Sequence, residues 1–124
     1  MPEMFAASPE EVHALFIAAF NSRDIDSLVS LYEPDAVFVT GAGPIAGHDA
    51  IREILQVFFE GHPKLSMTTR SVVAGGDIAL LQGEWTLAGV GPSGEPVTSQ
   101  GRSGEVIRKQ ADGRWLFAID QPNL

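Results

Sequence analysis

Cysteine is absent from this sequence of 124 residues, and basic residues are few. Without cysteine the chain can form no disulfide, no thiolate nucleophile and no cysteine-based metal site. Eight lysines and arginines stand against sixteen aspartates and glutamates, which gives a net charge of -8. Nucleic acids and anionic membranes both attract basic surfaces, so neither is an expected partner. The lack of cysteine is also typical of a reducing compartment, and we expect a cytoplasmic protein.

The sequence also lacks a long hydrophobic run. No apolar stretch approaches the roughly 18–20 residues that span a bilayer, and the start, Met1–Met4, lacks the basic and apolar segments of a signal peptide. Apolar residues nevertheless make up 44% of the chain, which is ordinary globular usage. A chain of this length can bury one hydrophobic core. We therefore predict a single domain over residues 1–124, with its core over about 9–121.

Helical patterns occupy the first half of the chain. Ser8–Glu11 supplies the capping residues and the early proline that begin a helix, and apolar residues then recur at helical spacing as far as Phe20. Asp24 is placed to cap a short second helix, which Pro34 is expected to end. A third helical pattern runs from about His48 to Glu60 and stops at a glycine.

Strand patterns occupy the second half, where three glycine-rich turn signals separate four candidates. Such hairpin turns join antiparallel neighbours. A short strand at residues 36–39 and a connecting loop from Gly41 to Gly47 precede the third helix. Helices segregated from an antiparallel sheet indicate an α+β fold. The four strands are expected at residues 64–74, 77–90, 97–110 and 114–121.

Two glycine-rich segments resemble functional motifs but fail on spacing. In the loop from Gly41 to Gly47 the last glycine of a dinucleotide fingerprint comes one position late, Pro44 removes an N–H, and no parallel βαβ unit follows. Gly101–Gly104 is one residue short of G-x-S-x-G and falls within a strand. The three histidines are isolated, without a second ligand at zinc-site spacing. We therefore expect neither a metal nor a cofactor.

Three carboxylates, Glu84, Glu105 and Asp120, occur within apolar strand segments. A buried carboxylate must be paired or protonated, and a protonated one can donate a hydrogen bond to a ligand carbonyl. The alternative is a set of salt bridges, because three arginines are close in sequence: Arg102, Arg108 and Arg114.

Strand alternation predicts which neighbours share a face with these carboxylates. It places Ser103 beside Glu105 on one face of its strand. In the last strand it places Leu116, Ala118 and Asp120 together, opposite Trp115, Phe117 and Ile119.

Four segments carry a family resemblance. They are the helix junction Asn21–Leu28, the strand entry Leu31–Phe38, the opening of the third helix at Gly47–Arg52, and the closing strand Gly113–Asp120. Each resembles the corresponding motif of the nuclear transport factor 2-like superfamily, and of its SnoaL-like group in particular. The resemblance covers residues from about 9 to 121, and the four motifs occur in the correct order.

The resemblance implies a strongly curved antiparallel sheet wrapped around N-terminal helices, the cystatin-like α+β roll. It also implies a cone-shaped apolar cavity and a homodimer formed through the outer face of the sheet. The group includes polyketide cyclases and steroid delta-isomerases, and both act on small, largely apolar molecules by acid/base chemistry.

Only part of the catalytic residue set of the steroid isomerases has a counterpart in this sequence. The position of its substrate-binding tyrosine is matched by Phe16, and that of its aspartate base by Thr40, which cannot accept a proton near neutral pH. Its protonated aspartate is matched by Glu105. Isomerisation by the usual mechanism is therefore not expected. For the acid/base pair of a cyclase the resemblance offers Asp120 with His13.

The sequence thus predicts a pocket for a small apolar carbonyl or epoxide compound. The catalytic candidates are Glu105, Asp120 and His13, in an isomerase, cyclase or hydrolase that uses no metal. The alternative is a non-enzymatic dimerisation or association module with a filled cavity, and the sequence leaves both open. The expected ligand-binding residues are Phe16, Phe20, Tyr32, Phe38, Thr40, Leu55, Phe59, Trp85, Ser103 and Ala118.

Overall fold

The computed structural model describes residues 5–124. The signal-peptide prediction concerns Met1–Met4, which lie outside the described residues. Within residues 5–124, no helix is long and apolar enough to cross a membrane. After a 3-10 turn at Pro9–Glu11, the elements are α1 (Val12–Asn21), α2 (Ile25–Val29), β1 (Tyr32–Thr40), β2 (Gly43–Ala46), α3 (His48–Phe58), β3 (Lys64–Gly75), β4 (Ile78–Val90), β5 (Pro96–Lys109) and β6 (Trp115–Gln121).

The predicted helix starts are confirmed. The Glu11 carboxylate accepts hydrogen bonds from the backbone N–H groups of Ala7 (2.7 Å) and Ser8 (3.0 Å), which fixes the turn before α1. Asp24 accepts from the backbone N–H of Ser27 (3.1 Å) and so caps α2. The predicted end of α2 at Pro34 is wrong, because the helix ends at Val29 and the chain is already extended at Tyr32.

The sheet has the strand order β2-β1-β6-β5-β4-β3. The predicted antiparallel meander of β3 to β6 is confirmed, whereas β1 lies parallel to β6. The predicted loop from Gly41 to Gly47 is wrong in part, since Gly43–Ala46 pairs with β1 as a hairpin. Pro44 has no N–H to donate, and it is tolerated there because β2 is an edge strand.

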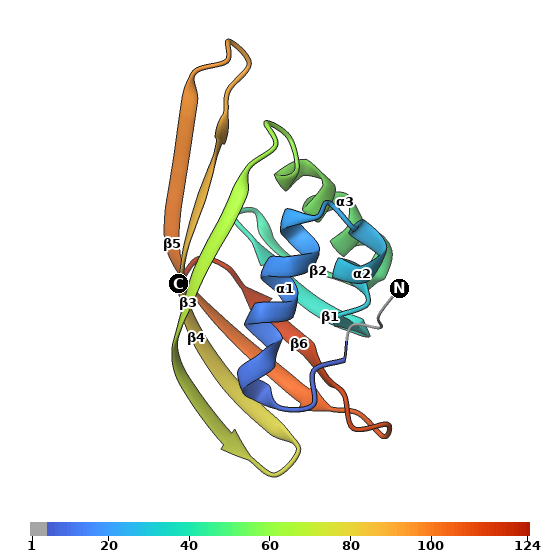
Figure 1. The fold of residues 1–124 in the computed structure, drawn as a ribbon. Helices are drawn as coiled ribbons and strands as arrows, with labels where there is room; N and C mark the ends of the chain where they lie inside the picture. The colour runs from blue at the N-terminus through green and yellow to red at the C-terminus, as the bar shows by residue number, and fades with distance from the viewer. Residues whose placement is uncertain (1–4) are drawn as a thin grey trace.

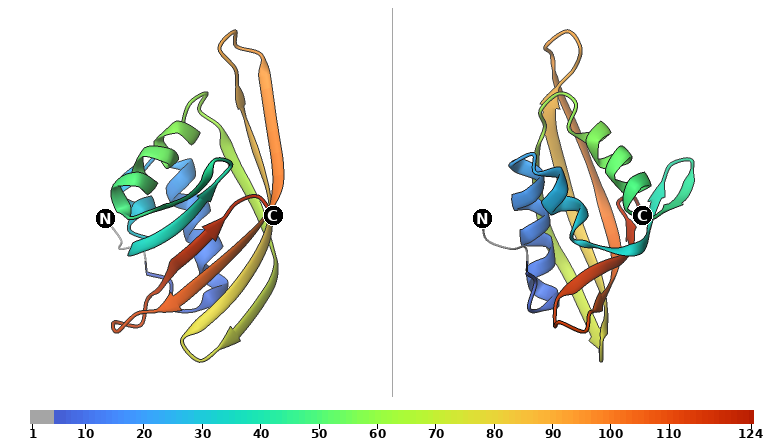
Figure 2. Two further views of the ribbon diagram at one scale, coloured as in Figure 1. Left: turned by 180° about the vertical axis from the view of Figure 1, so that it is seen from behind. Right: turned by 90° about the vertical axis from the view of Figure 1, so that its right-hand side faces the viewer.

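The sheet is strongly curved, and the helices lie against its inner face (Figure 1). Helix α1 crosses the inner face of the longer strands, and the far ends of β4 and β5 project beyond the helices (Figure 2). The α+β fold class is therefore confirmed. The buried core lies between the helices and this inner face, with Leu28, Ile51, Leu81 and Ile107 fully enclosed.

A β-bulge interrupts β6. Val106 of β5 pairs with Ile119, but the next residue, Ile107, pairs with Phe117, so that Ala118 is the extra residue. An extra residue reverses the alternation of faces beyond it. The predicted grouping of Ala118 with Asp120 is therefore wrong, and Phe117 and Asp120 both point to the inner side.

Candidate functional site

The cavity lies between the helices and the inner face of the sheet. Its volume is about 100 Å³, and its wall is largely apolar. Nine of the predicted site residues line it: His13, Phe16, Phe20, Phe38, Leu55, Trp85, Ser103, Glu105 and Asp120. The structure thus brings the three catalytic candidates, which are far apart in sequence, to one cavity.

Four predicted residues are not part of this lining. The hydroxyl of Thr40 donates to the backbone oxygen of Gly43 (2.7 Å) and accepts from the N–H of Ala42 (3.1 Å), so it secures the β1–β2 turn. Phe59 packs edge-on against Phe20, with ring centroids 5.1 Å apart. Tyr32 is not a lining residue, but its hydroxyl bonds to the lining residue Asp120, and Ala118 is the bulge residue.

Seven further lining residues were not predicted: Phe58, Leu65, Met67, Leu87, Phe117, Pro122 and Asn123. For Phe58 the sequence contained the signal, because it lies three positions after Leu55 on the same helical stripe. For Phe117 it did not, because the bulge that turns this ring inward depends on pairing between β5 and β6.

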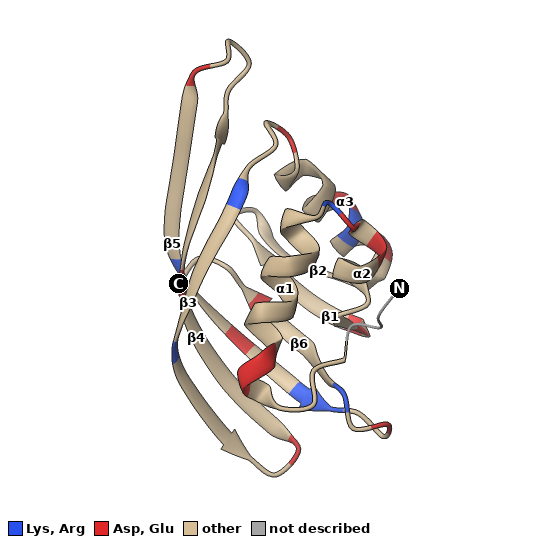
Figure 3. Cartoon of the chain, in the orientation of Figure 1, with Lys and Arg blue, Asp and Glu red and all other residues tan. Residues whose placement is uncertain are grey.

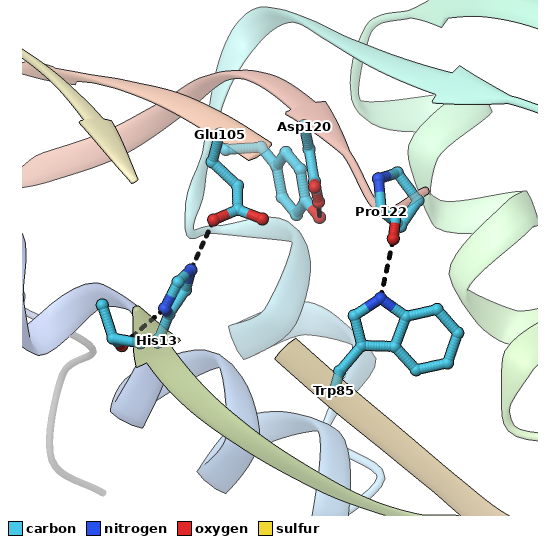
Figure 4. A network of polar contacts seen from close by, with 7 residues as sticks. His13, Trp85, Glu105, Asp120 and Pro122 are labelled. Atoms are coloured by element: carbon cyan, nitrogen blue, oxygen red, sulfur yellow. Dashed lines mark hydrogen bonds and ion pairs between the residues drawn. The ribbon is translucent and has the colours of Figure 1, made fainter. Parts of the chain in front are cut away.

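His13 forms the first polar pair of the site, with Glu105. Helix α1 places the imidazole over the sheet, where Nε2 contacts the Glu105 carboxylate and Nδ1 shares a hydrogen bond with the Thr69 hydroxyl (2.7 Å). His13 and Glu105 are each only 3% exposed. The pair suggested by the resemblance, Asp120 with His13, is therefore wrong, because Glu105 occupies the position next to the ring (Figure 4).

Gly83 leaves room for this approach of α1. It is the β4 residue opposite Ser103. A β-carbon at Gly83 would lie 3.2 Å from Cε1 of His13 and 3.1 Å from the hydroxyl oxygen of Ser103. Because glycine has no side chain, the imidazole can lie directly over β4 and reach Glu105.

Asp120 forms the second polar pair, with Tyr32. The phenol donates to Oδ2 of Asp120 at 2.5 Å, and Asp120 is the β6 partner of Glu105. Burial raises the pKa of Asp120 to about 7, and the neighbouring Glu105 carboxyl adds to this, whereas the hydrogen bond from Tyr32 lowers it. Burial also raises the pKa of Tyr32 well above its usual value of 10.0, so the phenol remains a donor.

The predicted salt bridges to arginine are wrong for both cavity carboxylates, Glu105 and Asp120. Arg108 pairs with Glu33 (3.0 Å) and Arg114 with Asp112 (2.7 Å), all away from the cavity. The acidic segments of β5 and β6 lie on neighbouring strands near the middle of the sheet (Figure 3). With a histidine and a tyrosine as partners, these carboxyls are placed to exchange protons with a ligand.

Glu84, the third strand carboxylate, belongs to the opposite face of the sheet. It pairs with Arg70 (2.7 Å) and is opposite Arg102 in the β4–β5 register. The hydrogen bond from Arg70 holds its pKa below the usual value. Glu84 therefore forms a salt bridge, as the alternative predicted, but its partner is Arg70 and not one of the three arginines that were named.

Trp85 closes one side of the cavity together with the last residues of the chain. Its indole N–H donates to the backbone oxygen of Pro122 (2.7 Å), as Figure 4 shows. The ring lies across Gly101, where a β-carbon would come within 2.8 Å of it. Pro122 and Asn123 become part of the wall through this contact.

Among the described residues, no group of three or more histidine, aspartate or glutamate side chains is placed to hold a metal ion. The cavity itself presents two adjacent carboxyl groups, those of Glu105 and Asp120. One is bonded to an imidazole and the other to a phenol, in a mostly apolar enclosure.

Comparison with solved structures gives many chains of the same fold. A ketosteroid isomerase-like protein from Erwinia carotovora atroseptica is 22% identical, with a TM-score of 0.79, over 90% of this chain and 89% of that chain. A Xanthomonas campestris protein, provisionally named a calcium/calmodulin dependent protein kinase II association domain, is 23% identical, with a TM-score of 0.76, over 94% and 91%. A cystatin-like protein of unknown function from Nostoc punctiforme is 15% identical, with a TM-score of 0.70, over 92% and 86%.

These likenesses are all below 25% identity and show the fold. None of the curated proteins compared with the chain matches it. The model of the SnoaL-like domain matches residues 12–117, which is most of the chain. The predicted superfamily and cystatin-like fold class are thus confirmed, and the chain belongs to the SnoaL-like domain family within the nuclear transport factor 2-like superfamily.

Proposed function

We propose that the cavity binds a small apolar carbonyl compound and catalyses the movement of a proton next to its carbonyl group. The observation that carries this proposal is the cross-strand placement of Glu105 and Asp120, each with its own hydrogen-bond partner, at one apolar cavity. A ligand that enters the cavity meets an acid and a base side by side.

The two carboxyls take different roles in this proposal. Asp120, whose pKa is about 7, keeps its proton in a large share of molecules up to about pH 7 and in that form donates a hydrogen bond to the carbonyl oxygen. Glu105, oriented by His13, takes a proton from the adjacent carbon, which leaves an enolate whose oxygen accepts the hydrogen bond from Asp120, and then returns the proton to carbon. The family resemblance matches Glu105 with a protonated donor. The partners of the two groups support the reverse assignment.

The size of the cavity limits the ligand. An apolar cavity of about 150 Å³ takes up benzene, and this one has about 100 Å³. Typical small-molecule sites are about 300–1,000 Å³. A five-membered cyclic ketone is therefore a suitable probe.

Deuterium exchange at the carbon next to the carbonyl of cyclopentanone tests the proposal directly, because it needs no knowledge of the natural substrate. In heavy water the protein is expected to accelerate the exchange above the buffer rate. Glu105→Gln should reduce the acceleration by about 10²–10⁴-fold, the usual contribution of a general base. Proton NMR follows the loss of the signal from the protons on the carbon next to the carbonyl.

Glu84→Gln is the matched control, since Glu84 is a strand carboxylate on the opposite face. This variant should catalyse deuterium exchange in cyclopentanone as fast as the unchanged protein does. Exchange at the buffer rate would contradict an enzymatic role, and full activity in Glu105→Gln would contradict the role of Glu105 as the base. Binding of cyclopentanone without exchange would instead identify a non-catalytic pocket protein.

We also propose that two copies of this chain, a single domain over residues 1–124, associate through the outer face of the sheet in the cytoplasm. An apolar row crosses four strands there in register: Val73, Leu80, Val106 and Ile119. Three of these side chains are 62%, 44% and 42% exposed: Val73, Leu80 and Ile119. A contiguous apolar patch on a free surface is typical of an interface. A two-fold axis between two copies can bring this row of one copy against the same row of the other.

Leu80→Arg is expected to convert the dimer into a monomer, because the charge is buried against the partner surface without a counter-charge. Size-exclusion chromatography with light scattering measures the mass. Val57→Arg serves as the control, since Val57 is 52% exposed on α3, away from the sheet. A monomeric starting protein, or a Leu80→Arg variant that remains dimeric, would contradict this interface.

A further inference from the structure

Ser103 is a buried polar group that the proposed reaction does not use. It is 1% exposed and lines the cavity. Among the buried side-chain nitrogen and oxygen atoms of residues 5–124, the hydroxyl oxygen of Ser103 is the one without a hydrogen-bond partner. Such a group normally destabilises a fold, and native structures rarely keep one without a reason.

The surroundings of the hydroxyl explain why no side chain satisfies it. Across the strand pair lies Gly83, which offers no side chain. The His13 ring presents its carbon Cε1 to the space beside Gly83, because both ring nitrogens are engaged with Thr69 and Glu105. The cavity that Ser103 lines is therefore where a hydrogen-bond partner can be placed.

The position of Ser103 relative to the two carboxyls defines a second polar point in the cavity. Ser103 and Glu105 are two residues apart on the same face of β5, which corresponds to about 7 Å along a strand. Asp120 is opposite Glu105 on β6. A small molecule whose carbonyl oxygen lies at Asp120 can thus place a second oxygen near Ser103.

We propose that Ser103 forms a hydrogen-bonding subsite, and that the ligand is a small apolar ketone carrying a second oxygen function, such as a hydroxyl, a few bonds from its carbonyl. This inference rests on the proposed function, since Asp120 holds the carbonyl end. Ser103 is then the specificity-determining residue, and it selects hydroxyketones over simple ketones.

Binding of two matched probes, cyclopentanone and 3-hydroxycyclopentanone, tests the subsite. NMR titration of the labelled full chain gives both dissociation constants. One additional neutral hydrogen bond corresponds to about a 5- to 10-fold preference for the hydroxyketone. In Ser103→Ala the ratio should fall to about 1, while the affinity for cyclopentanone stays unchanged. Ser99→Ala, on the same face of β5 but exposed, should keep the preference.

The ligand-free stability of Ser103→Ala separates a ligand-binding role from a structural one. Because the hydroxyl has no partner in the protein, its removal should leave the urea midpoint unchanged or raise it. A lowered midpoint would show that the hydroxyl supports the fold and would overturn the inference.

Equal affinities in the unchanged protein, or a preference that survives in Ser103→Ala, would overturn the subsite alone, because cyclopentanone still binds. If neither probe binds, the proposed function fails and the subsite fails with it. The two failures are thus distinguished within one set of titrations.

Discussion

Asp120→Asn is expected to make the protein more stable at neutral and alkaline pH and to flatten the dependence of its stability on pH. The reason is the pKa of Asp120, which rises from an ordinary value of 3.8 to about 7 in the folded chain. Below about pH 4 the carboxyl is neutral in both states. Between about pH 4 and 7 the unfolded chain has released this proton and the folded chain still binds it.

Folding therefore loses stability as the pH rises through this window. Each pH unit costs up to about 1.4 kcal/mol, and the whole window about 4 kcal/mol. Above about pH 7 both states are ionised and the loss is complete. Asparagine at position 120 is neutral throughout and can still accept the hydrogen bond from Tyr32, so the variant should avoid this loss.

Urea unfolding at pH 5, 6, 7 and 8 measures the effect. The gap in free energy of unfolding between Asp120→Asn and the unchanged protein should widen with pH and then level off. Asp35→Asn removes a carboxyl that is exposed on β1, and its curve should run parallel to that of the unchanged protein. If the free energy of unfolding of Asp120→Asn also followed the pH dependence of the unchanged protein, Asp120 would not be buried in its neutral form.

Phe117→Ala is expected to cost about 3–5 kcal/mol of stability, the usual range for a buried phenylalanine. The ring is 1% exposed. It packs edge-on against Phe16, with ring centroids 5.8 Å apart, and in a tilted arrangement against Tyr32, with centroids 4.9 Å apart. Removing it leaves space beside the existing cavity, so the variant should also bind benzene more tightly than the unchanged protein does.

Thermal unfolding with and without benzene checks both effects. The melting temperature of the variant should fall and then recover in part when benzene binds the folded state. Phe5→Ala, where the ring is 43% exposed, should change stability by no more than about 0.5 kcal/mol. If Phe117→Ala does not fold, Phe117→Leu provides the smaller step. A cost as small as that of Phe5→Ala would contradict the inward position that the bulge gives to Phe117.

Much of the architecture could be predicted because its signals are local. Helical spacing, the caps at Glu11 and Asp24 and the glycine turns of the meander depend on residues a few positions apart, and each is confirmed. Local signals did not give the position of β1 beside β6 or the β2 hairpin. Parallel neighbouring strands are not joined by a short turn, so no local sequence signal marks their pairing.

The candidate site was predictable only as a set of unusual residues. A carboxylate in an apolar strand indicates a special environment whatever its partner, and so Glu105 and Asp120 could be selected from the sequence. Their partners could not be identified, because His13 is 92 residues from Glu105 and Tyr32 is 88 residues from Asp120. Such contacts depend on how α1 and β1 pack on the sheet.

The sequence by itself determined the α+β class, the helix starts, the four-stranded meander and the shared strand face of Glu105 and Ser103, because periodicity and turn chemistry act over short distances. Only the tertiary structure decided that His13 reaches Glu105 over Gly83 and that Glu84 faces away from the cavity. It also decided that a bulge turns Phe117 inward with Asp120. The physical reason is that pairing register and helix placement are set by contacts between segments far apart in the chain, which no local pattern records.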